Sequence, residues 1–225
     1  MQQIVLRLID GDQHSDTFSF LAGQYLEIVH PNGTGIPLSI ASSPQRLPEI
    51  HLHYQSTPGL DAAALLDELL LTGSRFSIRG PLGKVFAAGD DDGRLLLVCG
   101  GTGAAQALAI ISDRHLCRST AQVTLLDFGE TDESLYYRDE LDALKAPWLE
   151  AIYVADPTRS QENAGMRWLT DHAADYHDQR VLICGAPAFV YAAVDSLVAG
   201  GMPEEQLESD VFAYAPRDDA SAADR

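Results

Sequence analysis

The sequence predicts a two-domain protein in which an antiparallel Greek-key β-barrel is followed by an α/β domain with a parallel sheet. Short alternating strand patterns with frequent Gly and Pro turns fill the first part of the chain, whereas apolar runs alternate with helical patterns in the second. A polar, glycine-flanked stretch at 88–93 divides the two parts. We therefore expect domains at 1–88 and 93–217, followed by a polar tail at 218–225.

The predicted barrel consists of short strands separated by turn signals. The segment 23–30 alternates apolar and polar residues and ends at the turn signal 31–33, Pro-Asn-Gly. A helix is expected at 60–71, because its apolar pattern begins after Gly59 and stops before Gly73. The expected strands lie at 4–9, 23–30, 37–41, 49–54 and 75–79.

The predicted α/β domain begins with the almost wholly apolar run 95–99. A run of this length without alternation suits a strand that is buried on both faces, as in a parallel sheet. Strand and helix patterns then alternate, which implies helices on both faces of that sheet. The expected strands lie at 95–99, 122–128, 149–154 and 180–184, and the expected helices begin near 104 or lie near 140–145, 167–173 and 188–198.

A glycine-rich turn joins the first strand and helix of this second domain. Gly100, Gly101, Thr102 and Gly103 follow the strand directly, so free backbone N–H groups at the helix N-terminus could bind a phosphate or pyrophosphate. Gln106 stands where the usual dinucleotide fingerprint has a third glycine or an alanine. A turn of this kind also occurs in α/β domains that bind nothing there, and the sequence leaves that alternative open.

Charge and composition restrict the choice of partners. The chain carries 33 Asp and Glu against 15 Lys and Arg, a formal charge of −18, which argues against nucleic acid and anionic membranes as partners. The three cysteines are widely spaced, and His51 and His53 have no third ligand in view, so we expect no disulfide framework, iron–sulfur cluster or metal site. Without a signal-peptide pattern or an apolar run of roughly 18 residues, we expect a cytoplasmic protein.

Seven short motifs in this order resemble the ferredoxin–NADP reductase superfamily, and most of all its small NAD(P)H:flavin oxidoreductase branch. They lie at 22–25, 37–44, 78–83, 99–103, 135–141, 183–187 and 210–212. The resemblance implies a flavin-binding barrel and an NAD(P)-binding α/β domain, with FAD or FMN in the crevice between them. It also implies an oxidoreductase that transfers hydride from NADH or NADPH to the flavin, and electrons then to free flavin or a separate acceptor protein.

The resemblance also assigns site residues. Ser39 would form a hydrogen bond to the flavin near N5, and Cys184 would border the nicotinamide, so both are expected in the catalytic site. The expected cofactor-binding residues are Pro37, Leu38, Ser39, Gly59, Gly100, Gly101, Thr102, Gly103, Gly185, Pro187, Phe212 and Tyr214.

Each assignment has a structural alternative. Ser39 could satisfy only its own backbone, Cys184 could simply be buried, and Phe212 and Tyr214 could belong to a C-terminal strand in the core. Asp61, in the first turn of the helix after Gly59, suits a cap better than a phosphate site.

The chain departs from the family pattern at three places. Ile36 and Leu38 replace the arginine and the aromatic residue of the flavin motif, so a flavin would be held loosely or not at all. Glu130 stands where relatives often carry arginine, which favours NADH over NADPH. Relatives have another strand before 4–9, so either the barrel lacks a strand or its edge is covered, and we predict a dimer or a swapped edge. The alternative function is a degenerate family member that binds a nucleotide or a partner subunit without catalysis.

Overall fold

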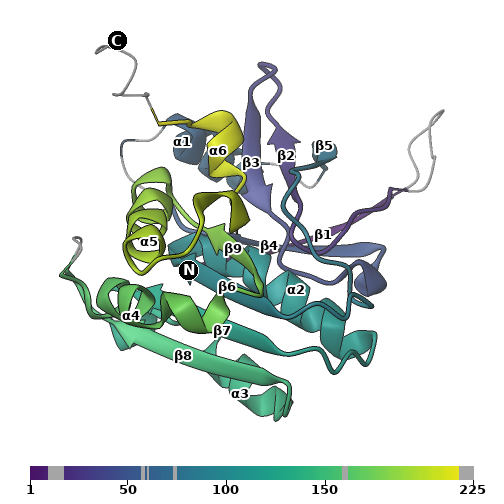
Figure 1. Cartoon of the computed structure of the whole chain (residues 1–225). Helices are drawn as coiled ribbons and strands as arrows, with labels where there is room; N and C mark the ends of the chain where they lie inside the picture. Colours follow the sequence, from purple (N-terminus) through teal and green to yellow (C-terminus); the bar gives the residue numbers. More distant parts are fainter. Residues whose placement is uncertain (10–17, 57–58, 60, 73–74, 159–161, 218–225) are drawn as a thin grey trace.

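The structure is a computed structural model that describes residues 1–9, 18–56, 59, 61–72, 75–158 and 162–217. The predicted polar tail at 218–225 lies outside the described residues. An antiparallel part and a parallel α/β part are packed together (Figure 1), which confirms the predicted fold class. The boundaries predicted for the two domains stay a prediction.

Five antiparallel strands form the N-terminal part, and all five were expected, with shifted ends. They are β1 (Gln2–Arg7), β2 (Tyr25–Val29), β3 (Gly35–Ser39), β4 (Glu49–Tyr54) and β5 (Ser77–Leu82). One sheet has the order β3-β2-β5 and a second sheet pairs β1 with β4. An isolated antiparallel bridge between Ile40 and Leu52 joins the two sheets.

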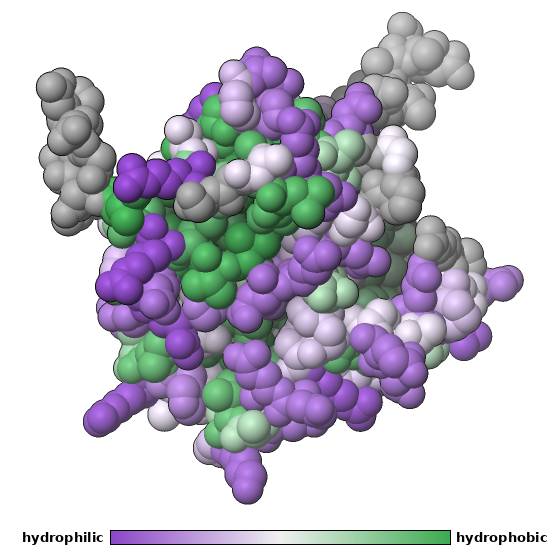
Figure 2. All heavy atoms as spheres, turned by 180° about the vertical axis from the view of Figure 1, so that it is seen from behind, coloured by the Kyte–Doolittle hydropathy of each residue, from purple (hydrophilic) through white to green (hydrophobic). Residues whose placement is uncertain are grey.

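The outer edge of β1 pairs with no other strand among the described residues, because β1 pairs only with β4. In this part of the molecule, Val5, Ile9 and Leu71 are 53%, 62% and 86% exposed. The face seen in Figure 2 is mostly hydrophilic and carries one broad apolar area. The dimer or swapped edge expected from the open strand stays a prediction.

The core of this part lies between the two small sheets and α1 (Asp61–Thr72). Leu26 and Ile28 of β2, Ile50 and Leu52 of β4, and Leu66 of α1 are fully buried there. Their spacing of two along each strand places them on one face. The intervening residues of β2, β3 and β4 therefore face outward.

The C-terminal part is a five-stranded parallel sheet with the order β10-β9-β6-β7-β8. Its strands are β6 (Leu95–Gly100), β7 (Val123–Gly129), β8 (Leu149–Ala155), β9 (Arg180–Cys184) and β10 (Leu207–Glu208). Its helices are α2 (Ala104–Leu116), α3 (Arg138–Leu144), α4 (Ala164–His172) and α5 (Pro187–Ala199).

Both faces of the central strand β6 are buried, as the apolar run at 95–99 predicted. Leu95 and Leu97 belong to the hydrophobic cluster that includes α2 and α3, whereas Leu96 and Val98 belong to the cluster that includes α4 and α5. Figure 1 shows these helix pairs on opposite sides of the sheet. Among the described residues, no helix is both long and apolar enough to cross a bilayer.

Two short elements near the C-terminus differ from expectation. The sequence analysis did not predict β10, because two residues carry no periodic signal. Phe212 and Tyr214 belong to α6 (Val211–Tyr214), a short helix, so the alternative of a C-terminal strand was wrong. The Asp210 side chain accepts hydrogen bonds from the backbone N–H groups of Lys84 and Val85, which fixes this segment against the antiparallel part.

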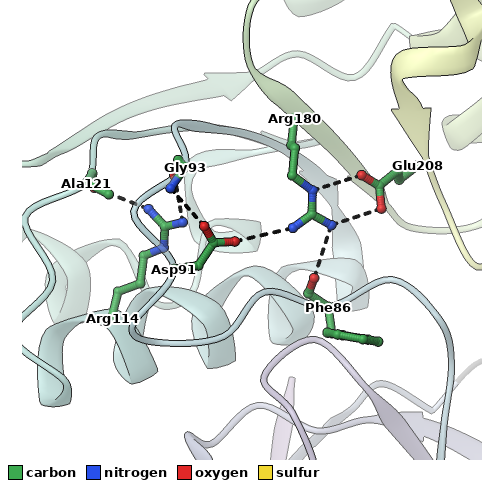
Figure 3. A network of polar contacts seen from close by, with 7 residues as sticks. All are labelled: Phe86, Asp91, Gly93, Arg114, Ala121, Arg180 and Glu208. Atoms are coloured by element: carbon green, nitrogen blue, oxygen red, sulfur yellow. Dashed lines mark hydrogen bonds and ion pairs between the residues drawn. The ribbon is translucent and has the colours of Figure 1, made fainter.

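A second set of polar contacts fixes the connection between the two parts (Figure 3). Arg180 forms a bidentate ion pair with Glu208 at 3.0 Å and donates to the carbonyl oxygen of Phe86. Asp91 lies 3.5 Å from the same guanidinium. The buried Arg114 donates to the carbonyl oxygen of Gly93 at 2.8 Å. These contacts hold the connecting segment against β9, β10 and α2.

Candidate functional site between the two parts

A cavity of about 630 Å³ lies where the antiparallel part meets the carboxyl edge of the parallel sheet. This volume lies within the range of small-molecule and cofactor sites. Its walls come from β2, β3, β4 and the start of α1 on one side, and from the glycine turn, the end of β9 and the Ser209–Tyr214 segment on the other. The predicted site residues that line it are Pro37, Leu38, Ser39, Thr102, Gly103, Cys184, Gly185 and Tyr214.

Other predicted site residues do not line this cavity: Gly59, Gly100, Gly101, Pro187 and Phe212. Gly101 and Pro187 are chain neighbours of lining residues, and Gly100 lies two positions before the lining residue Thr102. Phe212 packs against the cluster of α4 and α5, and its ring lies 6.0 Å from that of Tyr191. Its partner in the prediction, Tyr214, lines the cavity and is 61% exposed. Of these two aromatic rings, only that of Tyr214 is placed to cover a ligand.

The strand β3 positions Ser39 on the cavity wall. The apolar side chains of Ile36 and Ile40 are buried in the antiparallel core, so the alternation of the strand directs Pro37 and Ser39 outward, toward the parallel sheet. Ile36, at the position of the family's arginine, is 3% exposed. An apolar residue therefore fills the core where the family pattern has a phosphate ligand.

The glycine turn adopts the geometry that its sequence predicted. β6 ends at Gly100, and a short 3₁₀ turn leads into α2. Gly101 has φ +58°, and an added Cβ there would meet nothing within 4 Å. An added Cβ at Gly103 would collide with the carbonyl group of Cys184. The turn thus combines an open left-handed position with a close approach to the end of β9, a cradle that fits a pyrophosphate at the start of a 13-residue helix.

The Cys184 side chain is 2% exposed at the end of β9. Burial raises the pKa of its thiol, and the nearby Asp210 adds to this effect. The thiol therefore stays protonated near neutral pH and can only pack against a ligand or form a weak hydrogen bond. These properties fit a residue that borders a ring and not a nucleophile.

No arginine or lysine belongs to the described residues that line the cavity, whereas Glu27 and Asp210 do. Glu27 forms an ion pair with Arg79 at 2.6 Å. Ala62 and Ala63 of the first turn of α1 line the cavity, but Asp61 precedes them. The antiparallel side of the cavity thus fits a flat ring better than a phosphate group.

Several lining residues were not predicted as site residues, among them Tyr25, His53 and Gln106. Tyr25 belongs to the motif at 22–25, which the sequence analysis used only for the family resemblance. His53 was correctly placed on a sheet, but nothing in the sequence showed which strand lies beside it. Gln106 donates to the carbonyl oxygens of Gly23 and Val85 at 2.6 and 3.1 Å, so the residue that breaks the dinucleotide fingerprint joins the two parts. Among the described residues, no group of three or more His, Cys, Asp or Glu side chains could hold a metal ion.

Comparison with known proteins agrees with this geometry. Residues 97–195 match the oxidoreductase NAD-binding domain family. The chain is 28% identical over 204 residues to the terephthalate 1,2-dioxygenase reductase component 2 of Comamonas sp., covering 88% of this chain and 60% of that protein. It is 26% identical over 212 residues to a probable flavin reductase of Photobacterium leiognathi, covering 88% of each. These matches confirm the resemblance of the chain to the ferredoxin–NADP reductase superfamily.

Solved structures of several reductases share the fold. A cytochrome P450 reductase of Amycolatopsis matches with a TM-score of 0.75 and 22% identity, over 92% of this chain and 64% of that one. A ferredoxin NADP⁺ reductase of Neisseria gonorrhoeae, solved with bound FAD and NADP, matches with a TM-score of 0.69 and 17% identity, over 92% and 90%. The chain spans 60% of the length of the dioxygenase reductase component that it resembles.

Proposed function

We propose that this protein catalyses NAD(P)H-dependent reduction of a flavin, FAD, FMN or riboflavin, and passes electrons to free flavin or to a separate acceptor protein. The observation that carries the proposal is one cavity that joins Ser39, Gly103 and Cys184 from separate elements. The flavin would supply the redox chemistry by accepting hydride from the nicotinamide. The chain supplies binding, orientation and exclusion of water.

Each wall of the cavity has a defined task in this proposal. The amides of the glycine turn bind the pyrophosphate of the nicotinamide nucleotide, and Gly185 and Cys184 border the nicotinamide ring. Ser39 contributes a hydroxyl to the polar edge of the flavin, and Tyr214 covers a ring. The cavity then holds two planar rings in contact. This orientation of the two rings is the main source of rate enhancement here.

The flavin is held loosely in this proposal. With Ile36 in the core and no cation among the described lining residues, the phosphate of FMN or FAD gains no charge-assisted hydrogen bond. The same features favour the alternative, a family member that binds a nucleotide or a partner subunit and has lost catalysis. The nucleotide-binding form of this alternative keeps the nucleotide site on the parallel sheet.

The experiment that separates them mixes purified protein with NADH and riboflavin, FMN or FAD, and follows the nicotinamide absorbance. We expect oxidation above the protein-free control, with apparent affinities for the three flavins within about threefold of one another. A tenfold preference for FMN and FAD would contradict the loose phosphate site, since a charge-assisted hydrogen bond contributes about 1.5–3 kcal/mol. Absence of oxidation with every flavin would favour the non-catalytic alternative.

Glu130 predicts the choice of reductant. It is exposed and follows directly after β7, where an anion opposes the 2′-phosphate of NADPH. We expect kcat/KM for NADH to exceed that for NADPH by about tenfold, and Glu130→Gln to reduce this ratio mainly through KM for NADPH, because a like charge at a surface costs about 1 kcal/mol. A preference of the wild type for NADPH would refute this assignment.

A further inference from the structure

The antiparallel bridge between β3 and β4 brings Ser39 and His53 together. Ile40 pairs with Leu52, and the backbone N–H of Ala41 donates to the carbonyl oxygen of His51 at 2.8 Å. The same register places Ser39 directly opposite His53. Residues opposite each other in an antiparallel pair have Cβ atoms about 5 Å apart, on the same face. Both residues line the cavity, so the hydroxyl and the imidazole are neighbours on its wall.

A residue of the parallel part, Tyr136, holds the imidazole ring of His53 in place. Its Nδ1 lies 2.8 Å from the hydroxyl oxygen of Tyr136, and the two rings meet edge to face with centroids 5.2 Å apart. Burial raises the pKa of Tyr136, so this phenol stays protonated and can donate to Nδ1. In the tautomer in which Nδ1 accepts from this phenol, the neutral imidazole carries its proton on Nε2.

Two observations favour the neutral form with Nε2 available. Burial of His53 lowers its pKa, and the nearby His51 adds to this effect. Among the described residues, none forms a hydrogen bond with Nε2 of His53, although the residue is only 7% exposed. Nε2 is thus a donor at the cavity wall without a partner among the described residues. Such a donor suits a hydrogen-bond acceptor on a bound molecule.

We propose that His53 donates a hydrogen bond from Nε2 to an acceptor atom of the bound flavin ring, beside Ser39, and that Tyr136 orients it. This inference rests on the proposed function, because it needs a flavin in the cavity. The polar edge of the isoalloxazine ring carries several nitrogen and oxygen acceptors beside a single N–H donor, so two adjacent donors on the protein can match it. Tyr136 acts through His53 and is a positioning residue.

Binding of riboflavin, measured by quenching of its fluorescence without NADH, tests the inference separately from activity. We expect His53→Leu to raise the Kd about three- to tenfold, which is the range for one lost neutral hydrogen bond. His53→Gln should restore binding to within about twofold, because its amide nitrogen reaches the position of Nε2. Tyr136→Phe should raise the Kd by a smaller factor, since it removes the orienting hydroxyl and leaves the imidazole.

His51→Leu is the matched control. His51 lies two residues away on the same face of β4, contacts Gln3 and does not line the cavity, so this variant should bind riboflavin like the wild type. Unchanged binding by both His53→Leu and Tyr136→Phe, while Ser39→Ala weakens it, would overturn the inference and leave the proposed function standing. Should His53→Leu fail to fold, the Gln and Phe variants decide. Failure of the wild type to bind any flavin would refute the proposed function and the inference together.

Discussion

Gly103→Ala is expected to abolish NADH oxidation and to lower the free energy of unfolding by about 3 kcal/mol or more. The reason is steric. An added Cβ would collide with the carbonyl group of Cys184 and approach the amide of Gly185, and backbone atoms at the end of β9 cannot move aside as a flexible side chain can. The substitution must separate the glycine turn from β9, and these two elements form the walls of the proposed nucleotide site. Chemical denaturation and steady-state kinetics measure the two effects.

Alanine variants of Gly101 and Gly201 distinguish an effect on NADH binding from an effect on stability. Both glycines have positive φ, +58° and +94°, and an added Cβ at either would meet nothing within 4 Å. Alanine at either position should therefore cost about 1–2 kcal/mol, the price of a left-handed backbone. Gly101→Ala should also raise KM for NADH about tenfold, whereas Gly201→Ala, in the turn after α5, should leave KM unchanged. Equal kinetic effects of the two variants would contradict the proposal that the glycine turn binds the pyrophosphate.

Asp127→Asn is expected to change how stability depends on pH. Asp127 is 2% exposed in the middle of β7, and the Cys99 Sγ lies 3.4 Å from one of its carboxyl oxygens. Burial raises the pKa of Asp127 from 3.8 to about 7, partly opposed by hydrogen bonds from Cys99, Tyr137 and the backbone of Phe128. The folded protein thus prefers the protonated carboxyl group, while the unfolded chain ionises it near pH 4.

The sign of the effect follows from this difference. A raised pKa gives the folded state stability that is fully present below pH 4 and is lost as the pH rises through about 7. The full loss amounts to roughly 4 kcal/mol. The asparagine variant does not titrate, so its stability relative to the wild type should increase by up to that amount between pH 4 and pH 8.

Denaturant unfolding at several pH values tests this prediction. Asp90→Asn, a substitution at an exposed residue, makes the same change in net charge and serves as the control. A difference between wild type and Asp127→Asn that stays constant from pH 4 to pH 8 would show that the carboxyl group is ionised throughout in the folded protein.

Local hydrophobic patterns in the sequence were sufficient to predict most of the fold. The apolar run at 95–99 predicted a strand buried on both faces, and the structure confirms this, because alternate residues of β6 belong to the clusters on opposite sides of the sheet. The order of the recognition motifs was sufficient to predict the family resemblance that the comparisons support. The two-residue strand β10 and the four-residue helix α6 were missed, because neither is long enough to show a period.

The sequence by itself determined most of the elements, the glycine turn and the absence of the flavin motif's arginine and aromatic side chain, since each is a property of neighbouring residues. Only the tertiary structure decided which distant residues meet. Ser39 stands opposite His53 because β3 and β4 are bridged at Ile40 and Leu52, and Gln106 reaches Gly23 because α2 packs against the antiparallel part. Pairing and packing are set by the whole core, and no local pattern encodes them.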